Sequence, residues 1–288
     1  MAQLFKTIAV ITFVLVVAAA APLGAQWFKY PTPGAPRTAK GDIDMAAKTP
    51  RLANGKPDFS GVWMTAEPAC GVGGTVSVSE LVKLVPPSKK CPIRGAMMSR
   101  HGINMGVDLP GGLPYQPWLA ALVQKRTANQ ALDDPHIRCL PDTFLRAYGL
   151  PHYLKFVHTP NLLVMLNEMN GLYRQVFSDG RPLPNDPNPS WQGYSTATWS
   201  GDTLVIDSIG FRDDIWVDWD GSVITESAKL HERIRRPDFG HLEIEVTVDD
   251  PKAYTKPWSV SLRQQFAADT ELVDEICAEN EKFSQHLK

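Results

Sequence analysis

The sequence has little net charge and no cluster of basic residues. Its 29 Lys and Arg residues nearly balance its 31 Asp and Glu residues, so the formal net charge is −2. Binding to nucleic acid or to an anionic membrane surface normally depends on concentrated positive charge. We therefore expect neither nucleic acid nor a lipid surface as a partner.

Several motifs that would identify an enzyme class are missing as well. The seven histidines never occur in HxxxH, HxH or HExxH spacing, so the local sequence does not indicate a zinc hydrolase. There is no Gly-x-Ser-x-Gly nucleophile elbow. The glycines at 71, 73 and 74 lack the strand, helix and lysine of a phosphate-binding loop. We predict no metal and no cofactor.

Long apolar runs are rare, and the clearest one lies at the N-terminus. Lys6 precedes an uncharged apolar run over residues 8–21, and the segment 22–25 (Pro-Leu-Gly-Ala) ends it. This order is typical of a cleavable secretory signal. A membrane anchor is the alternative, but a membrane span needs about 20 apolar residues. No cysteine lies directly after the run, which argues against a lipoprotein anchor. We predict a signal peptide over residues 1–25, cleavage near Ala25, and a periplasmic or secreted protein.

Cysteine is also scarce, with four residues and no CxxC pair. The absence of CxxC spacing disfavours a zinc site built from cysteines. In an exported chain, four cysteines indicate two disulfides, for which three pairings exist. The simplest pairing joins Cys70 to Cys91 within a Gly- and Pro-rich stretch, and Cys139 to Cys277 across the strand-rich half.

Proline and glycine divide the rest of the chain. Residues 26–56 show no apolar period and are predicted to form an extended N-terminal arm or a leader that lies on the surface. Residues 57–288 are predicted to form one domain, with a loop and helix insertion at about 66–150 after the first strand. Apolar residues at helical spacing predict a helix over 116–132. A closing helix is expected over 271–283, which contains Cys277.

From Tyr153 onward, apolar residues alternate with polar ones, and turn residues separate the alternating segments. Asn170-Gly171 is a strong hairpin signal, because both turn positions need positive φ. Further turns are expected at 200–202 and 237–240, and the last strand at 258–266. Consecutive hairpins predict a mainly β fold, an antiparallel up-and-down barrel that leaves no free edge.

Gly61-x-Trp63 on the first strand and Arg263 on the last strand resemble the lipocalin and wider calycin pattern. In that family the tryptophan plugs the closed end of the barrel and the arginine packs across it, so the resemblance implies a lipocalin-like barrel. Residues 55–280 are also similar to a group of bacterial exported proteins, which implies export and this fold but no particular activity. The shared stretches include Gly55-Lys56-Pro57-Asp58, Asp179-Gly180-Arg181 and Trp199-x-Gly201-Asp202-Thr203-Leu204-Val205.

Two polar residues share a strand face with the predicted core. Glu232 lies between Leu230 and Ile234 in the alternating pattern, and Gln264 lies on the same face as Leu262. A carboxylate among apolar neighbours must be paired, hydrogen-bonded or protonated, because desolvation disfavours its charge. Glu232 is therefore either a ligand-binding or catalytic group, or half of a structural pair with Arg174, Arg233 or Arg235.

Two further regions carry candidate site residues. Tyr194 and Asp207 come opposite each other if Ser200-Gly201 forms a two-residue hairpin turn, and they then form either a pocket pair or a solvated cross-strand pair. The segment 211–220 mixes acids with indoles, including Trp216 and Asp218. It is interpreted as a pocket rim, as a surface loop, or as a Ca²⁺ loop that does not follow the EF-hand order.

These features lead to three functional hypotheses. The first is an exported barrel that binds a small apolar or aromatic molecule in an internal cavity. Its ligand-binding residues are Arg174, Trp199, Trp216, Asp218 and Gln264. The second is a cofactor-independent hydratase, lyase, isomerase or cyclase that uses the same cavity, with catalytic groups at Glu232, Asp207 and Tyr194. The third is a structural envelope module, whose barrel would be filled by side chains.

Overall fold

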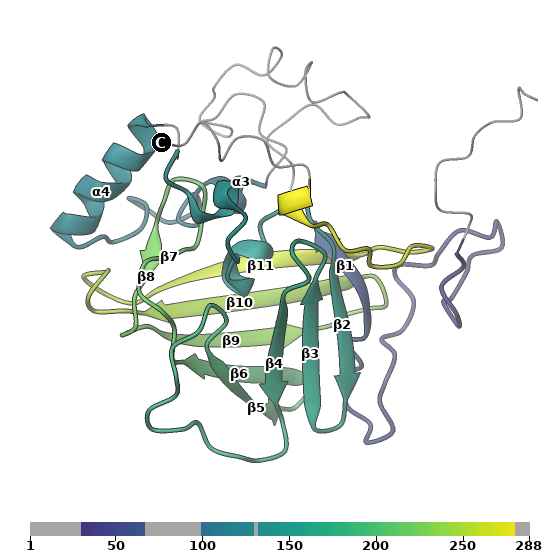
Figure 1. The fold of residues 1–288 in the computed structure, drawn as a ribbon. Helices are drawn as coiled ribbons and strands as arrows, with labels where there is room; N and C mark the ends of the chain where they lie inside the picture. Colours follow the sequence, from purple (N-terminus) through teal and green to yellow (C-terminus); the bar gives the residue numbers. More distant parts are fainter. Residues whose placement is uncertain (1–29, 67–98, 130–131, 280–288) are drawn as a thin grey trace, which may run out of the picture.

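The computed structural model describes residues 30–66, 99–129 and 132–279 of the chain. The predicted signal peptide, Cys70 and Cys91 lie outside the described residues. Within them, no helix is long and apolar enough to cross a membrane. The described chain forms a closed β-barrel with helices gathered at one end (Figure 1).

Nine strands form the barrel in the order β1-β11-β10-β9-β6-β5-β4-β3-β2, and β7 with β8 makes a separate two-stranded ribbon. This confirms the predicted mainly β, closed-barrel fold. The strands are β1 (Gly61–Thr65), β2 (Leu154–Thr159), β3 (Leu162–Asn167), β4 (Tyr173–Phe177), β5 (Tyr194–Ser200), β6 (Thr203–Ile209), β7 (Ile215–Trp216), β8 (Val223–Ile224), β9 (Lys229–Arg235), β10 (His241–Asp249) and β11 (Trp258–Phe266).

One pair of neighbouring strands departs from the up-and-down pattern. β4 and β5 are parallel and pair only briefly, at Val176 with Ser195 and Phe177 with Thr196. The other neighbours in the ring are antiparallel. A closed ring with an odd number of strands cannot reverse direction at every step, so it needs at least one parallel pair. The segment 178–193 provides the crossover connection that a parallel pair requires.

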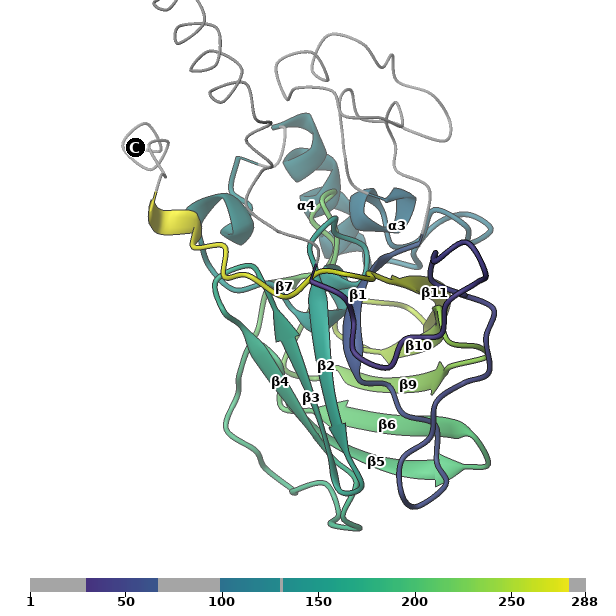
Figure 2. The same ribbon diagram turned by 90° about the vertical axis from the view of Figure 1, so that its right-hand side faces the viewer.

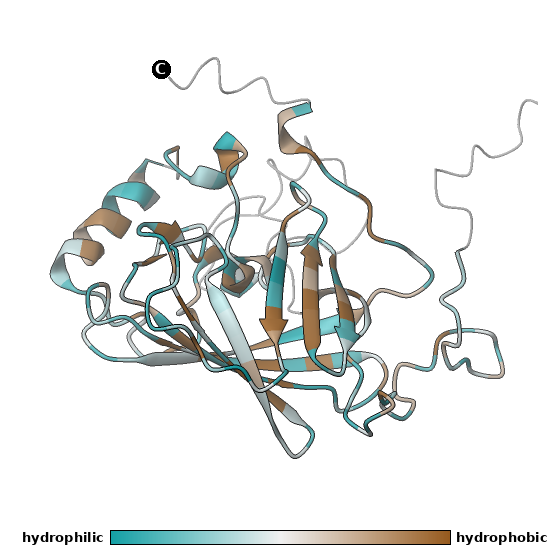
Figure 3. Cartoon of the chain, turned by 60° about the horizontal axis from the view of Figure 1, so that its bottom comes forward, coloured by the Kyte–Doolittle hydropathy of each residue, from teal (hydrophilic) through white to brown (hydrophobic). Residues whose placement is uncertain are grey.

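Alternation along the strands places apolar side chains inside the barrel. On β10, the even-numbered residues Leu242 to Val248 are buried, and the residues between them face outward. Hydrophobic and hydrophilic bands along the strands are visible in Figure 3. The predicted hairpins are confirmed, including the turn at Asn170 and Gly171, where φ is 57° and 59°.

Trp63 is fully buried, but the arginine that packs on it differs from the one that the lipocalin resemblance indicated. The guanidinium of Arg236, from the turn between β9 and β10, lies 4.8 Å from the Trp63 ring centre. Arg263 is exposed on the outer face of β11, because the alternation of that strand directs Leu262 and Gln264 inward. Gly61 has φ of 137°, and a Cβ there would overlap the Phe266 ring, so the glycine of this motif has a steric cause.

The insertion between β1 and β2 carries the helices that cover one end of the barrel (Figures 1 and 2). Its described part contains three α-helices and one 3₁₀ helix. The predicted helix over 116–132 is observed, and it ends at Ala128. The elements are α3 (Arg100–Ile103), α4 (Pro117–Ala128), the 3₁₀ helix η1 (Pro135–Arg138) and α5 (Phe144–Ala147). All four residues of α5 are buried, so this short helix forms part of the core.

The prediction of a closing helix over 271–283 is wrong for the residues that the structure describes. Residues 271–276 are not helical, and only Cys277–Glu279 forms a 3₁₀ turn, η2. The backbone groups of Glu275 are used in pairing with the end of β3: its N–H donates to Glu168 O at 2.8 Å, and its carbonyl accepts from Asn170 N at 2.7 Å. A helix would need those same groups for its own hydrogen bonds.

Two further connections join distant parts of the sequence to the barrel. The N-terminal arm lies along the outside of the barrel (Figure 2), where Phe239 N donates to Ala47 O at 2.8 Å. Arg51 on this arm forms an ion pair with Asp202. Cys139 and Cys277 form a disulfide, as predicted, and it joins the insertion to the C-terminal segment.

Candidate functional site

A buried ion pair crosses the interior of the barrel. Glu232 on β9 is 0% exposed and Arg174 on β4 is 2% exposed. Arg174 Nη2 donates to Glu232 Oε2, and Tyr148 Oη donates to Glu232 Oε1 at 3.1 Å. Of the three arginines considered from the sequence, Arg174 is thus the partner. Both Glu232 oxygens have a hydrogen-bond partner, as a buried carboxylate requires.

The remaining groups of Arg174 are also paired. Its Nε donates to Ser195 Oγ at 3.1 Å, and its Nη2 donates to Ser208 Oγ at 2.9 Å. The two serine hydroxyls lie 2.9 Å apart, on β5 and β6. The guanidinium carbon lies 3.3 Å from the centre of the Phe144 ring. Arg174 is therefore fixed by contacts from β3, β5, β6 and β9 and from α5.

Tyr148 follows α5 and connects the insertion to this ion pair. Burial and the adjacent Glu232 raise the pKa of Tyr148 well above its ordinary value, so the phenol keeps its proton and acts as a donor. Gln264, which the sequence placed on the core face of β11, is 1% exposed and donates to the carbonyl of Tyr148 at 2.8 Å. Gln264 thus positions the backbone of Tyr148.

A cleft of about 430 Å³ opens on the outside of the barrel where β4 and β5 separate. Its lining is rich in aromatic and amide side chains, and Arg174 lies at its inner wall. Inside the barrel wall, a space of about 20 Å³ beside Arg174 and Tyr148 has room for about one water molecule. The residues that line the cleft are Pro141, Gly171, Leu172, Tyr173, Arg174, Gln175, Phe177, Ser190, Trp191, Gln192, Gly193 and Tyr194.

Arginine side chains hold the aromatic rim of the cleft. The Arg212 guanidinium lies 4.9 Å from the Trp191 ring centre, and that of Arg181 lies 4.0 Å from the Phe177 ring centre. Phe177 in turn stacks on Tyr194, with ring centres 5.4 Å apart. Such contacts restrict the rings, which lowers the entropy lost when a ligand binds between them.

The insertion forms a second buried ionic cluster behind the cleft. Arg146 donates to both oxygens of Asp134, at 2.8 and 2.5 Å, and its Nη1 lies 3.3 Å from Asp142 Oδ1. Burial by itself would raise the pKa of Asp142, but Arg146 and a hydrogen bond with His136 outweigh it and lower that pKa. This cluster fixes α5, and therefore Phe144 and Tyr148, against the barrel.

The structure does not bring all the predicted site residues together. Glu232, Arg174 and Gln264 belong to the buried network, and Tyr194 lines the cleft. Trp199 stacks on Phe59 and His158 away from that cleft. Trp216 is buried beneath Arg126, and Asp218 accepts hydrogen bonds from Met105 N and Ser222 N.

The expected pairing of Tyr194 with Asp207 is wrong by two residues. The two-residue turn is Gly201-Asp202 rather than Ser200-Gly201, and this register places Thr196 opposite Asp207 and Ile209 opposite Tyr194. Asp207 faces outward, where its Oδ1 lies 2.7 Å from His231 Nδ1. Asp207 therefore does not reach the buried network.

Three residues of the network were not identified from the sequence. Ser208 shares the face of Leu204 and Ile206, so the period-two pattern could have found it. Ser195 shares the face of Ala197 in the same way. Tyr148 had no such signal, because it comes from the insertion and reaches Glu232 only through the tertiary fold.

Comparison of this chain with models of protein families, with curated proteins and with solved structures finds no match. We therefore infer the chemistry of the cleft and of the buried network from their geometry.

Proposed function

We propose that the protein binds a small planar aromatic molecule in the cleft between β4 and β5. The observation that carries this proposal is the interruption of the barrel wall: β4 and β5 pair at two positions only, and Tyr173, Trp191 and Tyr194 surround the opening. A volume of about 430 Å³ lies within the usual range of small-molecule sites, about 300–1,000 Å³.

The lining favours an aromatic ligand over an aliphatic one. Tyr173 is 63% exposed, which leaves a large apolar surface available for stacking. Gln175 and Gln192 supply donors and acceptors for one or two polar substituents. A planar ring with a hydroxyl or carbonyl group satisfies both features of the cleft.

The proposed site lies in the wall of the barrel rather than in an open lumen. The space beside Arg174 has room for only about one water, and buried side chains from opposite strands occupy the interior. In this arrangement the Arg174–Glu232 pair supports the inner wall of the cleft.

Acid–base catalysis by Glu232 is less well supported by this geometry. A general base must reach the proton that it removes, whereas both Glu232 oxygens accept hydrogen bonds from Arg174 and Tyr148. An enzymatic function would be favoured over a binding function if the wild type forms product and Glu232→Gln retains ligand affinity but forms none.

Calorimetric titration with 2-naphthol tests the binding proposal, and its saturated counterpart 2-decalol is the matched probe. We expect saturable binding of 2-naphthol to one site and much weaker binding of 2-decalol. Tyr173→Ala and Trp191→Ala should each weaken 2-naphthol binding by about 2- to 12-fold, the effect of one aromatic contact. Tyr30→Ala is the control, because Tyr30 is similarly exposed, at 51%, and does not line the cleft.

Two outcomes would reject this proposal. One is the absence of saturable 2-naphthol binding by a correctly folded protein. The other is equal affinity in the Tyr173→Ala and Tyr30→Ala variants, which would place the binding site elsewhere.

We also propose that the chain is exported after cleavage near Ala25. The disulfide between Cys139 and Cys277 supports this, since such bonds form and persist in oxidising compartments. Fractionation of cells that express the full sequence, with N-terminal sequencing of the product, tests it. A product that retains residues 1–25 in the cytoplasm would contradict the proposal.

A further inference from the structure

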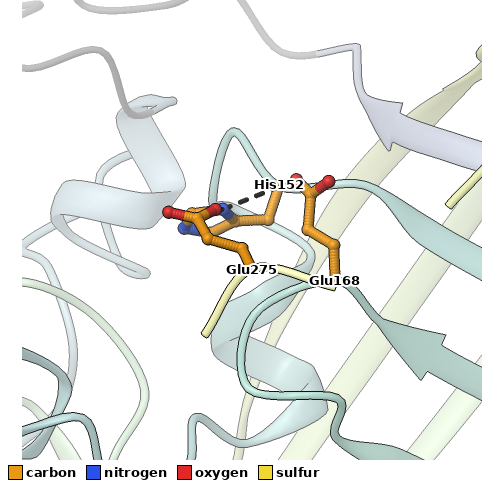
Figure 4. Close-up of side chains that lie close together, drawn as sticks. All are labelled: His152, Glu168 and Glu275. Atoms are coloured by element: carbon orange, nitrogen blue, oxygen red, sulfur yellow. Dashed lines mark ion pairs between the residues drawn. The ribbon is translucent and has the colours of Figure 1, made fainter. Parts of the chain in front are cut away.

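The side chains of His152, Glu168 and Glu275, from separate parts of the chain, converge on one another (Figure 4). His152 precedes β2, Glu168 follows β3, and Glu275 lies on the C-terminal segment. One ligand atom from each of these residues lies within 4.8 Å of the others. His152 and Glu168 are largely buried, whereas Glu275 is half exposed, so the group is open on one side.

The distances within this group do not fit hydrogen bonds. His152 Nδ1 lies 3.6 Å from Glu168 Oε1 and 3.4 Å from Glu275 Oε2, beyond the usual 2.7–3.2 Å. By contrast, His136, His231 and His241 each have Nδ1 at 2.7 Å from a carboxylate oxygen, a normal hydrogen-bond distance. Two ligands of a tetrahedral ion with bonds of about 2.0–2.2 Å are separated by about 3.3–3.6 Å. The two separations from His152 match this spacing, and the Glu168 and Glu275 oxygens lie within 4.8 Å of each other.

The backbone around the three residues is fixed independently of their side chains. Glu168 N donates to Tyr153 O at 3.1 Å, and Glu275 N donates to Glu168 O at 2.8 Å. Glu168 Oε1 also accepts from Tyr153 N at 2.6 Å, which orients the carboxylate in the way that outer hydrogen bonds orient metal ligands. The disulfide of Cys277, two residues beyond Glu275, ties the third segment down.

Two carboxylates share one histidine in this group. In the described part of the chain, the ion pairs of Glu168 and of Glu275 are both made with His152. A single imidazole, even when protonated, carries at most half the charge needed to neutralise two carboxylates. A divalent cation supplies the full charge, and an imidazole ligand favours zinc and similar transition metals over calcium or magnesium.

We propose that His152, Glu168 and Glu275 form a binding site for Zn²⁺ or a similar transition-metal ion, with water in the fourth position. The site is separate from the cleft between β4 and β5. Local sequence does not reveal it, because its ligands lie at positions 152, 168 and 275 and come together only when β2, β3 and the C-terminal segment are assembled.

The test is a Zn²⁺ titration of the full chain with its disulfide oxidised, in competition with a chromophoric chelator, followed by Co²⁺ substitution and visible absorption. We expect one equivalent of Zn²⁺ and the absorption bands of tetrahedral or five-coordinate Co²⁺. Loss of an outer-shell partner typically weakens metal binding by about 10- to 100-fold. Loss of a ligand, in His152→Ala or Glu275→Gln, should therefore weaken Zn²⁺ binding at least tenfold.

Two variants serve as controls. His231→Ala removes a histidine that is hydrogen-bonded to a carboxylate on the barrel exterior, and it should bind Zn²⁺ as the wild type does. His136→Ala tests whether the neighbouring His136 is also a ligand, because its ring centre lies only 6.0 Å from that of His152. We expect His136→Ala to retain the Co²⁺ bands.

Glu275→Gln is the decisive variant, since Glu275 is 56% exposed at its side chain and its loss should leave the fold intact, as circular dichroism can verify. Unchanged Zn²⁺ affinity in folded Glu275→Gln would overturn the proposal. The absence of a one-equivalent site in the wild type would overturn it too and leave only a histidine ion pair. None of these results depends on the aromatic ligand.

Discussion

At the scale of single residues, the Arg174–Glu232 pair is the most consequential polar contact of the barrel. Both side chains are almost completely buried, and their polar contacts are made with residues of β5, β6, β3 and the insertion. Pairing of buried charges compensates for desolvation, whereas loss of one partner leaves the other charge unpaired in a medium of low polarity.

Glu232→Leu should therefore lower the free energy of unfolding by about 3–5 kcal/mol, because it leaves the Arg174 charge buried and unpaired. Urea denaturation measures this loss. Glu245→Gln is the control, since Glu245 pairs with Arg233 at 3.8 Å on the exposed outer face of the neighbouring strand. Exposed pairs contribute about 0–1 kcal/mol. The double variant Arg174→Met with Glu232→Leu should recover part of the lost stability, and equal losses in Glu232→Leu and Glu245→Gln would contradict this assignment.

Asp218 gives the protein a specific dependence on pH. It is 0% exposed. Burial, together with the neighbouring Asp220, raises its pKa to about 6, although hydrogen bonds from Met105 and Ser222 act in the opposite direction. The folded protein thus binds a proton at Asp218 more tightly than the unfolded chain does. The stability that this proton contributes is present below about pH 4 and is lost as the pH rises through about 6.

Asp218→Asn should remove this dependence. Relative to the variant, the wild type should lose up to about 3 kcal/mol of unfolding free energy between pH 4 and pH 7, from a shift of about two units. Urea denaturation of both proteins at several pH values provides the comparison, and the difference cancels the contributions of other carboxylates. A difference that stays constant with pH would show that Asp218 titrates alike in the folded and unfolded states.

At the scale of secondary-structure elements, the C-terminal segment shows what sequence patterns can and cannot predict. Hairpin turns such as Asn170-Gly171 depend on local backbone conformation, so the β half of the chain was predictable. Residues 271–276 also have helix-forming composition, yet Glu275 pairs with the residues that follow β3, and the nearby Cys277 is bonded to Cys139. Such long-range contacts override local propensity.

The same reasoning explains which site residues were predictable. Glu232 and Gln264 follow from strand alternation, which is local. The choice of Arg174 as partner, and the participation of Tyr148, depend on which strands and loops meet across the barrel. The parallel pairing of β4 with β5, which creates the cleft, likewise depends on closure of the whole ring.

The disulfide is the covalent link between the insertion and the C-terminal segment. Cys139 and Cys277 are separated by 138 positions, and closing a loop of this size contributes about 4–5 kcal/mol in the chain-entropy model. Cys139→Ser with Cys277→Ser should lower the free energy of unfolding by about that amount, as measured by urea denaturation. Wild-type protein in a reducing buffer should show a similar loss. Unchanged stability in both cases would mean that the unfolded chain is compact without the bond.

At the scale of the whole molecule, the barrel has its shortest strand pairing between β4 and β5. β9, β10 and β11 pair continuously, with β10 hydrogen-bonded on both sides over nearly its whole length. β4 and β5 meet at two residue pairs, and the segment 178–193 lies outside the sheet. Local opening follows the regions with the fewest backbone hydrogen bonds. The barrel should therefore open first at the cleft that we propose as the ligand site.

Native-state hydrogen exchange tests this expectation residue by residue. Amides of Arg174, Gln175 and Tyr194 should exchange through local opening, with protection well below that of Ile244 and Val246 on β10, whose exchange should require global unfolding. Addition of 2-naphthol should slow exchange at the β4–β5 edge and leave β10 unchanged, because a ligand that binds only the closed cleft opposes its opening. Equal protection at both places would mean that the parallel pair is as stable as the antiparallel sheet, and the cleft would then be a rigid surface feature rather than the point at which the barrel opens.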